Sequence, residues 1–251
     1  MSIEAYEPSK NDVEGGGNGG GGSWGNVNLL EEAGGPKKNT CSLDTETKEL
    51  ARWGSFVTTK IDVEQSCPRA AHPSDMHSFK TVNRLSGSEM KLTDFFRDED
   101  IYKAMMDNKD IQDALGKAGE YPKNFDELEK VLYAPGPGVS IDATPMGENY
   151  QGPEKIEGYL NEDALKNFAF YEVVADHDSA QIKTRVLMDY GAEASRNSLP
   201  YVDLYLPMPN ELQQAKQIFK ADSLDQGFLM KDSKQYGAGS YKHEDIPNPF
   251  E

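Results

Sequence analysis

One short segment holds residue types that could bind a metal. Cys67, His72 and His77 follow one another at intervals of five residues, with Asp75 between the histidines and Cys41 upstream. Thiolate and neutral imidazole are the usual zinc ligands, and a His-x3-5-His spacing fits a Cys2His2 site. The two cysteines do not form a Cys-x2-4-Cys knuckle, and the prolines of this segment favour a loop. We therefore expect no bound metal here; metal binding or enzymatic use of this loop is the alternative.

Two further patterns could carry chemistry. His177 lies between the carboxylates of Asp176 and Asp178, and an acid beside a histidine can tune a general base. The segment YGAGSY (236–241) contains G-x-G but does not lie between a predicted strand and a predicted helix. Neither pattern is accompanied by a nucleophile motif. We expect a polar turn at 176–178, no catalytic residue, no cofactor, and a protein that is not an enzyme.

The composition limits the class of partner. The chain has 251 residues, 37% of them hydrophobic, and a formal net charge of −17. Such a charge repels phosphate backbones, so a direct nucleic-acid partner is not expected, whereas a basic partner or cations remain open. The start, MSIEAYEPSK, has no signal-peptide pattern, and no apolar run reaches the roughly 18 residues of a membrane helix. We expect a virion or cytoplasmic location and no membrane.

The first 90 residues divide into two parts. Residues 1–40 hold seven glycines in the eight positions 15–22, and ordering glycine costs more backbone entropy than ordering any other residue. We expect a flexible, extended or disordered arm, which is either a plain linker or a docking arm with Trp24 as its contact point. Residues 41–90 are predicted as a mixed loop and strand segment, with a β-branched strand at 53–63 and a loop at 66–78. Two cysteines are too few for a disulfide scaffold.

Residues 91–133 are predicted as short helices. Thr93 is a candidate N-cap, Asn108 marks a break, and Asn124 with Glu127 has capping-box spacing. The run 94–113 holds seven acids against three bases, which is typical of a solvated helix face. Residues 134–153, together with Tyr133, hold four prolines and four glycines, so we expect a linker without regular structure.

Residues 154–222 are predicted as an α+β core. Asn161 is a candidate cap for a helix that carries Leu165, Phe168 and Tyr171, and alternation predicts a strand at 180–190. A second strand runs from Tyr201 to Leu206 and ends at Pro207, followed by a helix. The core is expected to contain one alternating set of apolar side chains: Ile182, Val186, Leu204, Leu206 and Phe219. Changes at Asp203 or Tyr205, which point to the other side, are expected to affect mainly assembly. Residues 223–251 are expected to be an irregular tail.

The second strand also carries a family resemblance. The segment VDLYLPMPNEL (202–212), preceded by the alternating strand, resembles the strand that opens the tube-like β domain in baseplate and tube-initiator proteins of contractile-tailed phages. In that family much of the β domain follows the motif, whereas 44 residues follow Pro207 here. The resemblance therefore implies a virion or large-assembly component and transfers no functional residue.

These patterns together predict an α+β fold with a small β-containing C-terminal core, short helices, long irregular loops and a Gly-rich arm. We expect a non-enzymatic structural or adaptor subunit of a large assembly, with a phage tail or baseplate as the specific candidate. Its partners are expected to be other protein subunits, bound through the arm near Trp24, the 134–153 loop and the C-terminal tail. A soluble enzyme or metal-binding protein using the Cys67, His72 and His77 loop remains the alternative.

Overall fold

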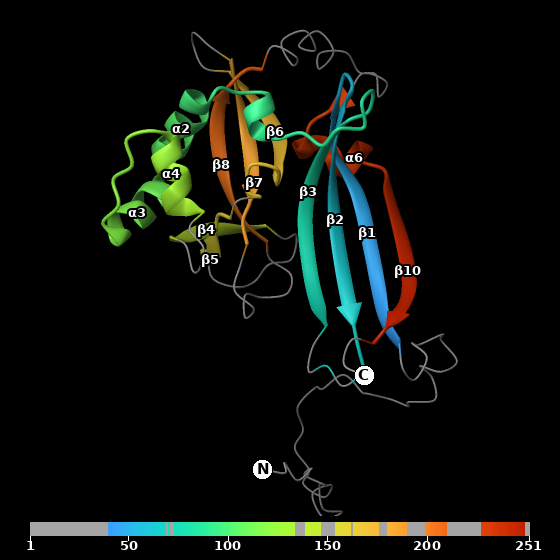
Figure 1. Ribbon diagram of the computed structural model, residues 1–251. Coiled ribbons are helices and arrows are strands. Elements are labelled where there is room, and N and C mark those ends of the chain that lie inside the picture. Colours follow the sequence, from blue (N-terminus) through green and yellow to red (C-terminus); the bar gives the residue numbers. More distant parts are fainter. Residues whose placement is uncertain are drawn as a thin grey trace, which may run out of the picture. The chain divides into compact units, whose positions relative to one another are not determined.

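The structure is a computed structural model of the full chain (Figure 1). It describes residues 40–68, 70, 73–133, 139–146, 154–161, 163–175, 180–189, 199–209 and 227–248. The chain divides into two units, residues 1–36 and 37–251, and all described residues belong to the second unit. The expectation of a flexible arm that docks through Trp24 lies outside the described residues.

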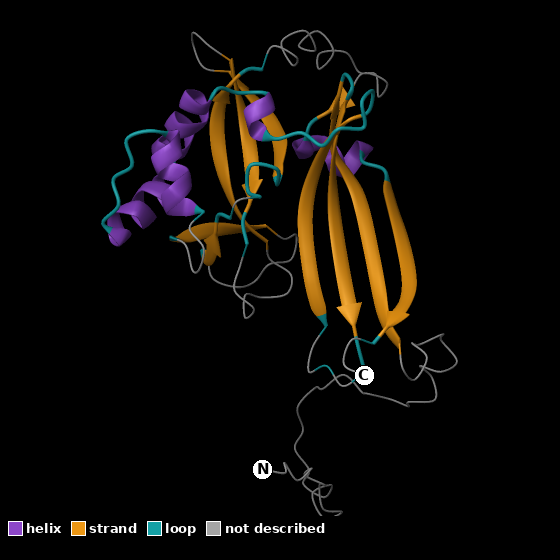
Figure 2. Cartoon of the chain, in the orientation of Figure 1, coloured by secondary structure: helices purple, strands orange, loops and turns teal. Residues whose placement is uncertain are grey.

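Four long antiparallel strands form the first sheet, in the order β10-β1-β2-β3 (Figures 1 and 2). A short strand, β9, pairs with the end of β1. The strands are β1 (Thr40–Trp53), β2 (Phe56–Ser66), β3 (Ser74–Asn83), β9 (Gly227–Phe228) and β10 (Gly239–Pro247). Strands from the two ends of the described chain therefore lie side by side.

The β1–β2 hairpin begins the fold. Trp53 pairs with Phe56, which leaves a two-residue turn in which Gly54 adopts a φ of +52°. Such turns need a left-handed backbone, which glycine adopts without steric cost. The prediction of a mixed loop and strand segment at 41–90 is thus wrong in extent. Most of the segment is a three-stranded meander, and β3 begins inside the predicted loop at 66–78.

The second sheet has the order β5-β4-β8-β7-β6. Its strands are β4 (Ser140–Met146), β5 (Ile156–Tyr159), β6 (Phe168–Ala175), β7 (Ala180–Leu187) and β8 (Leu199–Pro207). The predicted strands at 180–190 and 201–206 are confirmed as β7 and β8, which pair in antiparallel register with Ile182 opposite Leu206. As predicted, β8 ends at Pro207; the helix expected after it, with Phe219, lies outside the described residues.

Short helices cover one face of the second sheet (Figures 1 and 2). After the 3-10 turn η1 (Leu92–Asp94) come α2 (Asp98–Asp107), α3 (Lys109–Ala118) and α4 (Phe125–Leu132); α2 contacts β8 and α3 contacts β4. The predicted break at Asn108 is confirmed, because its side chain caps α3 at the Ile111 N–H. Asn124 likewise caps α4. Thr93 is not an N-cap, because η1 already begins at Leu92.

The main core lies between the helices and the second sheet. Ile182, Val186 and Leu204 are fully or almost fully buried with the inner faces of the helices. The core continues into the first sheet through Trp53, whose ring centroid lies 4.7 Å from that of Phe170 on β6. Strand β6 also contacts β1 and β3. Ile182, Val186, Leu204 and Leu206 of the predicted apolar set thus belong to a core that both sheets share.

Three segmental predictions are wrong. The 134–153 segment contains β4, in which Pro145 lies opposite Pro200 of β8. The helix expected after Asn161 is a set of turns followed by β6, in which Phe168 and Phe170 alternate into the core. The described part of the 223–251 tail, residues 227–248, consists largely of regular elements: β9, η3 (Met230–Asp232), α6 (Ser233–Tyr236) and β10.

The described residues form an α+β fold in which strands dominate. The core is larger than the predicted C-terminal one, because β1, β2, β3 and β10 add a second sheet. Among the described residues, no helix combines the length and the apolar character needed to cross a lipid bilayer.

Candidate functional site

The two sheets face each other across a cleft of about 950 Å³, which we call the inter-sheet cleft. One wall is formed by alternate side chains of β1, β2 and β3, and the other by side chains of β4, β6, β7 and β8 that point away from the helices. Met230 and Lys231 of η3 also line it. The cleft is concave and lined by both charged and aromatic side chains, so it is the first candidate for a functional site.

Arg185 dominates the wall from the second sheet. Its guanidinium carbon lies 3.7 Å from the ring centroid of Tyr201 and 4.3 Å from that of Tyr171. Its Nε also lies 3.0 Å from Oδ1 of Asp203, whose Oδ2 is 2.8 Å from Lys183 Nζ. The same carboxylate outweighs the effect of burial and raises the pKa of Lys183. The Arg185 guanidinium therefore lies against the rings of Tyr171 and Tyr201 and forms an ion pair with Asp203.

This arrangement changes the role expected for Asp203. The side chain points away from the helix-covered core, as predicted, but it contacts two cations in a largely buried position. Removing the carboxylate would leave both cations without that partner, which is costly where water is excluded. We therefore expect Asp203 to stabilise the fold as well, and an effect on assembly stays a prediction. Tyr205, by contrast, is 48% exposed.

The wall from the first sheet is acidic towards the disulfide end. Asp44, Glu64 and Asp75 lie directly opposite one another on β1, β2 and β3. Carboxylates in such a row repel each other. On β10, His243 is opposite Asp44, with 2.7 Å between Nδ1 and Oδ1. Hydrogen bonds from Tyr241 and His243 lower the pKa of Asp44, so part of the negative charge is compensated.

The next row holds the nearest approach to a catalytic group. His77 Nδ1 lies 2.7 Å from Asp62 Oδ1, and Lys60 Nζ lies 2.7 Å from Asp62 Oδ2. Burial raises the pKa of Asp62, but the hydrogen bonds from His77 and Lys60 outweigh it, and the net pKa is lowered. A carboxylate that orients an imidazole is one half of a general-base arrangement. It needs a nucleophile or a bound substrate within reach to do chemistry.

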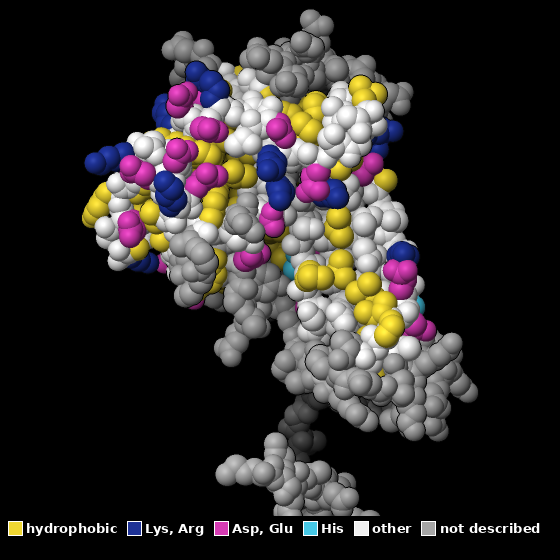
Figure 3. Space-filling view, in the orientation of Figure 1, with side chains coloured by type: hydrophobic (Ala, Val, Ile, Leu, Met, Phe, Trp, Pro, Cys, Tyr) yellow, Lys and Arg dark blue, Asp and Glu magenta, His cyan; other side chains and the backbone are white. Residues whose placement is uncertain are grey.

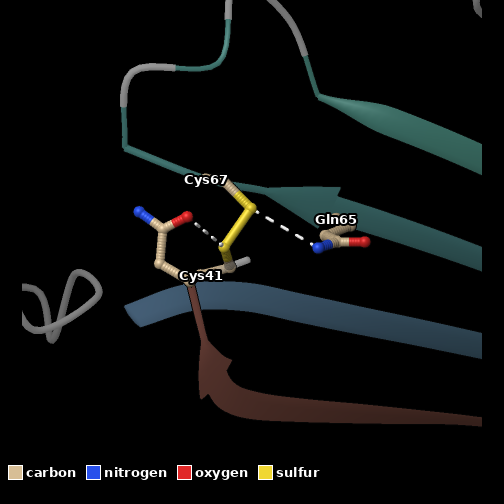
Figure 4. The surroundings of a disulfide bond; sticks show 4 residues. Cys41, Gln65 and Cys67 are labelled. Carbon is tan, nitrogen blue, oxygen red and sulfur yellow. Dashed lines mark hydrogen bonds between the residues drawn. A yellow bond between two sulfur atoms is a disulfide. The ribbon is translucent and has the colours of Figure 1, made fainter. Parts of the chain in front are cut away.

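The predicted metal-ligand residues are not brought together as a thiolate site. Cys67 forms a disulfide with Cys41 (Figure 4). The bond joins the start of β1 to the residue after β2, because the register places Ser42 opposite Ser66. Gln65 Nε2 lies 3.4 Å from the Cys67 sulfur. A disulfide sulfur is not a thiolate, so Cys67 becomes a metal ligand only after reduction.

The other members of that pattern are separated. His72 lies outside the described residues, and His77 is on β3, where it pairs with Asp62. Across the described part of the chain, no group of three or more His, Cys, Asp and Glu side chains is placed to hold a metal ion. The disulfide is the feature that sequence reasoning missed. The Cys41–Cys67 pairing follows from the register of β1 and β2, which could not be predicted from the sequence alone.

The other sequence patterns, at 176–178, at 236–241 and in the acidic run 94–113, either have a structural explanation or lie outside the described residues. Residues 176–178 are outside the described residues. Gly237 of the G-x-G pair packs where a Cβ would lie 2.3 Å from the Glu49 carbonyl oxygen. The absence of a side chain at Gly237 therefore lets the chain pass close to β1 just before β10 begins. The acidic run over α2 and α3 is in part locally paired, as between Arg97 and Asp100 at 2.9 Å.

In comparisons with known proteins, the chain matches no family model, no curated protein and no solved structure. The central charges of the inter-sheet cleft are paired with neighbours in the protein. The cleft can receive a polar segment, but it presents no assembled set of nucleophile, base and oxyanion donors among the described residues.

Proposed function

We propose that the chain is a non-enzymatic structural or adaptor subunit of a large assembly, with a phage tail or baseplate component as the specific candidate. Its partners are other protein subunits. The arm near Trp24, the 134–153 segment and the C-terminal segment are the proposed points of attachment. The position of β10 at the edge of the first sheet supports attachment through the C-terminal segment.

The observation that supports this proposal is the apolar character of one face of the first sheet. We call it the outer face; it carries Leu43, Ile61, Val63 and Met76, which alternate along the strands with Asp44, Asp62 and Asp75 of the cleft wall, and Val63 also borders the cleft. Met76 is 61% exposed and the other three are half-buried. Figure 3 shows hydrophobic side chains gathered over the lower part of this sheet. Contiguous exposed apolar side chains of this kind mark protein-binding surfaces.

Two further features agree with an assembly role. The Cys41–Cys67 disulfide ties the end of the β1–β2 hairpin that is remote from the shared core. Disulfides persist in oxidising surroundings, which include the virion surface, and are rare where thiols are kept reduced. The central cleft charges are paired within the second sheet, as expected for ion pairs with a structural role rather than for a catalytic centre.

The test compares two lysine substitutions of exposed apolar residues. Met76→Lys places a charge on the outer face, and Leu85→Lys is the matched control in a turn, where the side chain is 88% exposed. The full-length protein is tagged in its native source, and its particle size and cross-linked partners are measured. We expect Met76→Lys to remove the protein from the particle at unchanged melting temperature and Leu85→Lys to leave it in place.

The alternative is an enzyme or metal-binding protein that uses Cys67, His72 and His77. It would be favoured if the native protein sediments as an isolated chain and, after reduction, binds stoichiometric zinc that Cys67→Ser or His77→Gln removes. If the protein binds zinc and is also incorporated normally into a particle, it has both a metal site and an assembly role.

A further inference from the structure

Among the described strands, none pairs with the outer edge of β10. β10 ends the order of the first sheet, and residues 239–245 are all exposed. Figure 1 shows no described element on its far side. The edge of a sheet presents unpaired N–H and C=O groups, which pair readily with another strand. The question is which strand fits this edge.

The backbone groups that face outward follow from one hydrogen bond. The Glu49 N–H donates to the carbonyl of Ala238 at 2.8 Å, so Ala238 directs its backbone oxygen towards β1. In an antiparallel ladder this direction alternates from residue to residue. The odd-numbered residues of β10 therefore present their backbone groups to the open edge. Tyr241, His243 and Asp245 each offer a donor and an acceptor there.

The side chains of β10 are complementary to a second copy of the same strand. β10 runs from Gly239 to Pro247, so His243 is its middle residue. An antiparallel pair with a two-fold axis at His243 overlaps all nine residues. It places Lys242 opposite Glu244 of the other copy, and the reverse, on the outer face. On the cleft face it places Tyr241 opposite Asp245.

Other two-fold registers lose this complementarity. An axis at Lys242 opposes two lysines, and an axis at Glu244 opposes two glutamates. Like charges directly opposite each other destabilise a strand pair, and opposite charges stabilise it. In the single chain, Lys242 Nζ lies 2.7 Å from Glu244 Oε1, with side chains 67% and 45% exposed, so both groups are accessible. Charged side chains on an edge strand usually prevent pairing with other strands. Here Lys242 and Glu244 instead favour pairing with a second copy of β10, because each meets its opposite charge there.

We propose that β10 pairs with β10 of a second copy of this chain, antiparallel and centred on His243, and so joins two first sheets into one continuous sheet. This dimer goes beyond the proposed assembly role and does not use the outer-face residues Val63 and Met76. A strand edge buries little surface, so the dimer is expected to be weak and concentration-dependent. Two-fold pairing of one surface patch also closes the assembly at two copies.

The test uses charge reversal in the full-length protein, measured by sedimentation velocity over a wide concentration range. Lys242→Glu and Glu244→Lys are each expected to raise the dimer dissociation constant roughly tenfold to a hundredfold, because two attractive pairs become two repulsive ones. The double variant K242E/E244K restores the pairs and the dimer. An equimolar mixture of the two single variants should also form a dimer, because acids again oppose bases at both positions.

The controls separate this proposal from folding and from the assembly role. Lys103→Glu makes the same charge change on an exposed position of α2 and should leave the dimer unchanged. A chain that stays monomeric at all concentrations overturns the proposal, as does a dimer that both single reversals leave intact. Met76→Lys tests the outer face separately from the β10 dimer. If this variant leaves the particle but still forms the dimer, the result agrees with both the assembly role and the dimer.

Discussion

Arg185 lies directly opposite Asp203 on the β7–β8 pair, and the two side chains form an ion pair of 3.0 Å in which only 10% and 19% of their surfaces are exposed. Lys183 joins the same carboxylate. The pair lies on the cleft side of the second sheet, with the rings of Tyr171 and Tyr201 on the guanidinium. Asp203 therefore balances two cations in a site with little access for water.

Asp203→Ala should destabilise the fold by about 3 kcal/mol, because two partly buried cations lose their carboxylate. The matched control is Asp142→Ala. Its ion pair with Lys117 is largely exposed, with 69% and 61% of the side chains accessible, and should cost less than about 1 kcal/mol. Urea unfolding of both variants measures the difference. Equal losses would show that Asp203 contributes no more than a surface pair.

Leu204→Ala should cost about 2 to 5 kcal/mol, because the fully buried side chain would leave a cavity between the helices and the second sheet. The adjacent variant Tyr205→Ala is the control, since Tyr205 is 48% exposed and points to the other side. Its effect should stay within about 0.5 kcal/mol. An unchanged melting temperature for Leu204→Ala would mean that the register of β8 is wrong.

Local patterns in the sequence predicted the elements whose burial alternates cleanly. In β8, Val202, Leu204 and Leu206 are buried in turn, and a proline ends the strand. The caps at Asn108 and Asn124 were equally predictable, because a capping side chain acts within three residues. These features depend on neighbours in the chain, so one sequence is enough to find them.

The first sheet was underestimated for the opposite reason. β1 and β2 are polar on the cleft side and only half-buried on the other, so their periodicity is weak. The partner of Thr40 is Pro247, about two hundred residues away, and no local pattern specifies such a pairing. The disulfide and the inter-sheet cleft both follow from these long-range registers. For that reason, the sequence did not reveal either of them.

Removing the Cys41–Cys67 disulfide should lower stability by about 3 to 4 kcal/mol, because the bond closes a loop with a sequence separation of 26. The double variant Cys41→Ser/Cys67→Ser is compared with the parent in denaturant melts, with and without reductant. The parent should fall to the level of the double variant when reduced. If reductant leaves the midpoint of the parent unchanged, the disulfide contributes nothing.

Gly237→Ala should destabilise the chain by about 1 to 3 kcal/mol, because the new Cβ would lie 2.3 Å from the Glu49 carbonyl oxygen and 2.6 Å from that of Ser233. Gly239→Ala is the control, since its nearest contact is at 3.2 Å. If the G-x-G pair were a nucleotide loop instead, both variants would keep full stability and lose nucleotide binding. Thermal melts with and without ATP distinguish the two interpretations.

The Asp44–His243 pair should make the chain sensitive to pH. The hydrogen bond to Asp44 raises the pKa of His243 above its ordinary value of about 6.5. A raised histidine pKa contributes stability that is full below the unfolded pKa and is lost as the pH rises through the folded pKa. Asp44, whose pKa is lowered, contributes above about pH 4 and loses its contribution as the pH falls through its folded pKa.

The pair should therefore be strongest between about pH 4 and pH 6.5. An NMR titration of His243, at a concentration low enough to keep the chain monomeric, should give a pKa above about 6.5. Asp44→Asn should return that pKa towards the ordinary value. Asp245→Asn should change it less, because the Asp245 carboxylate is 3.8 Å from His243 Nε2. A His243 pKa that Asp44→Asn leaves unchanged would mean that the two side chains do not interact in solution.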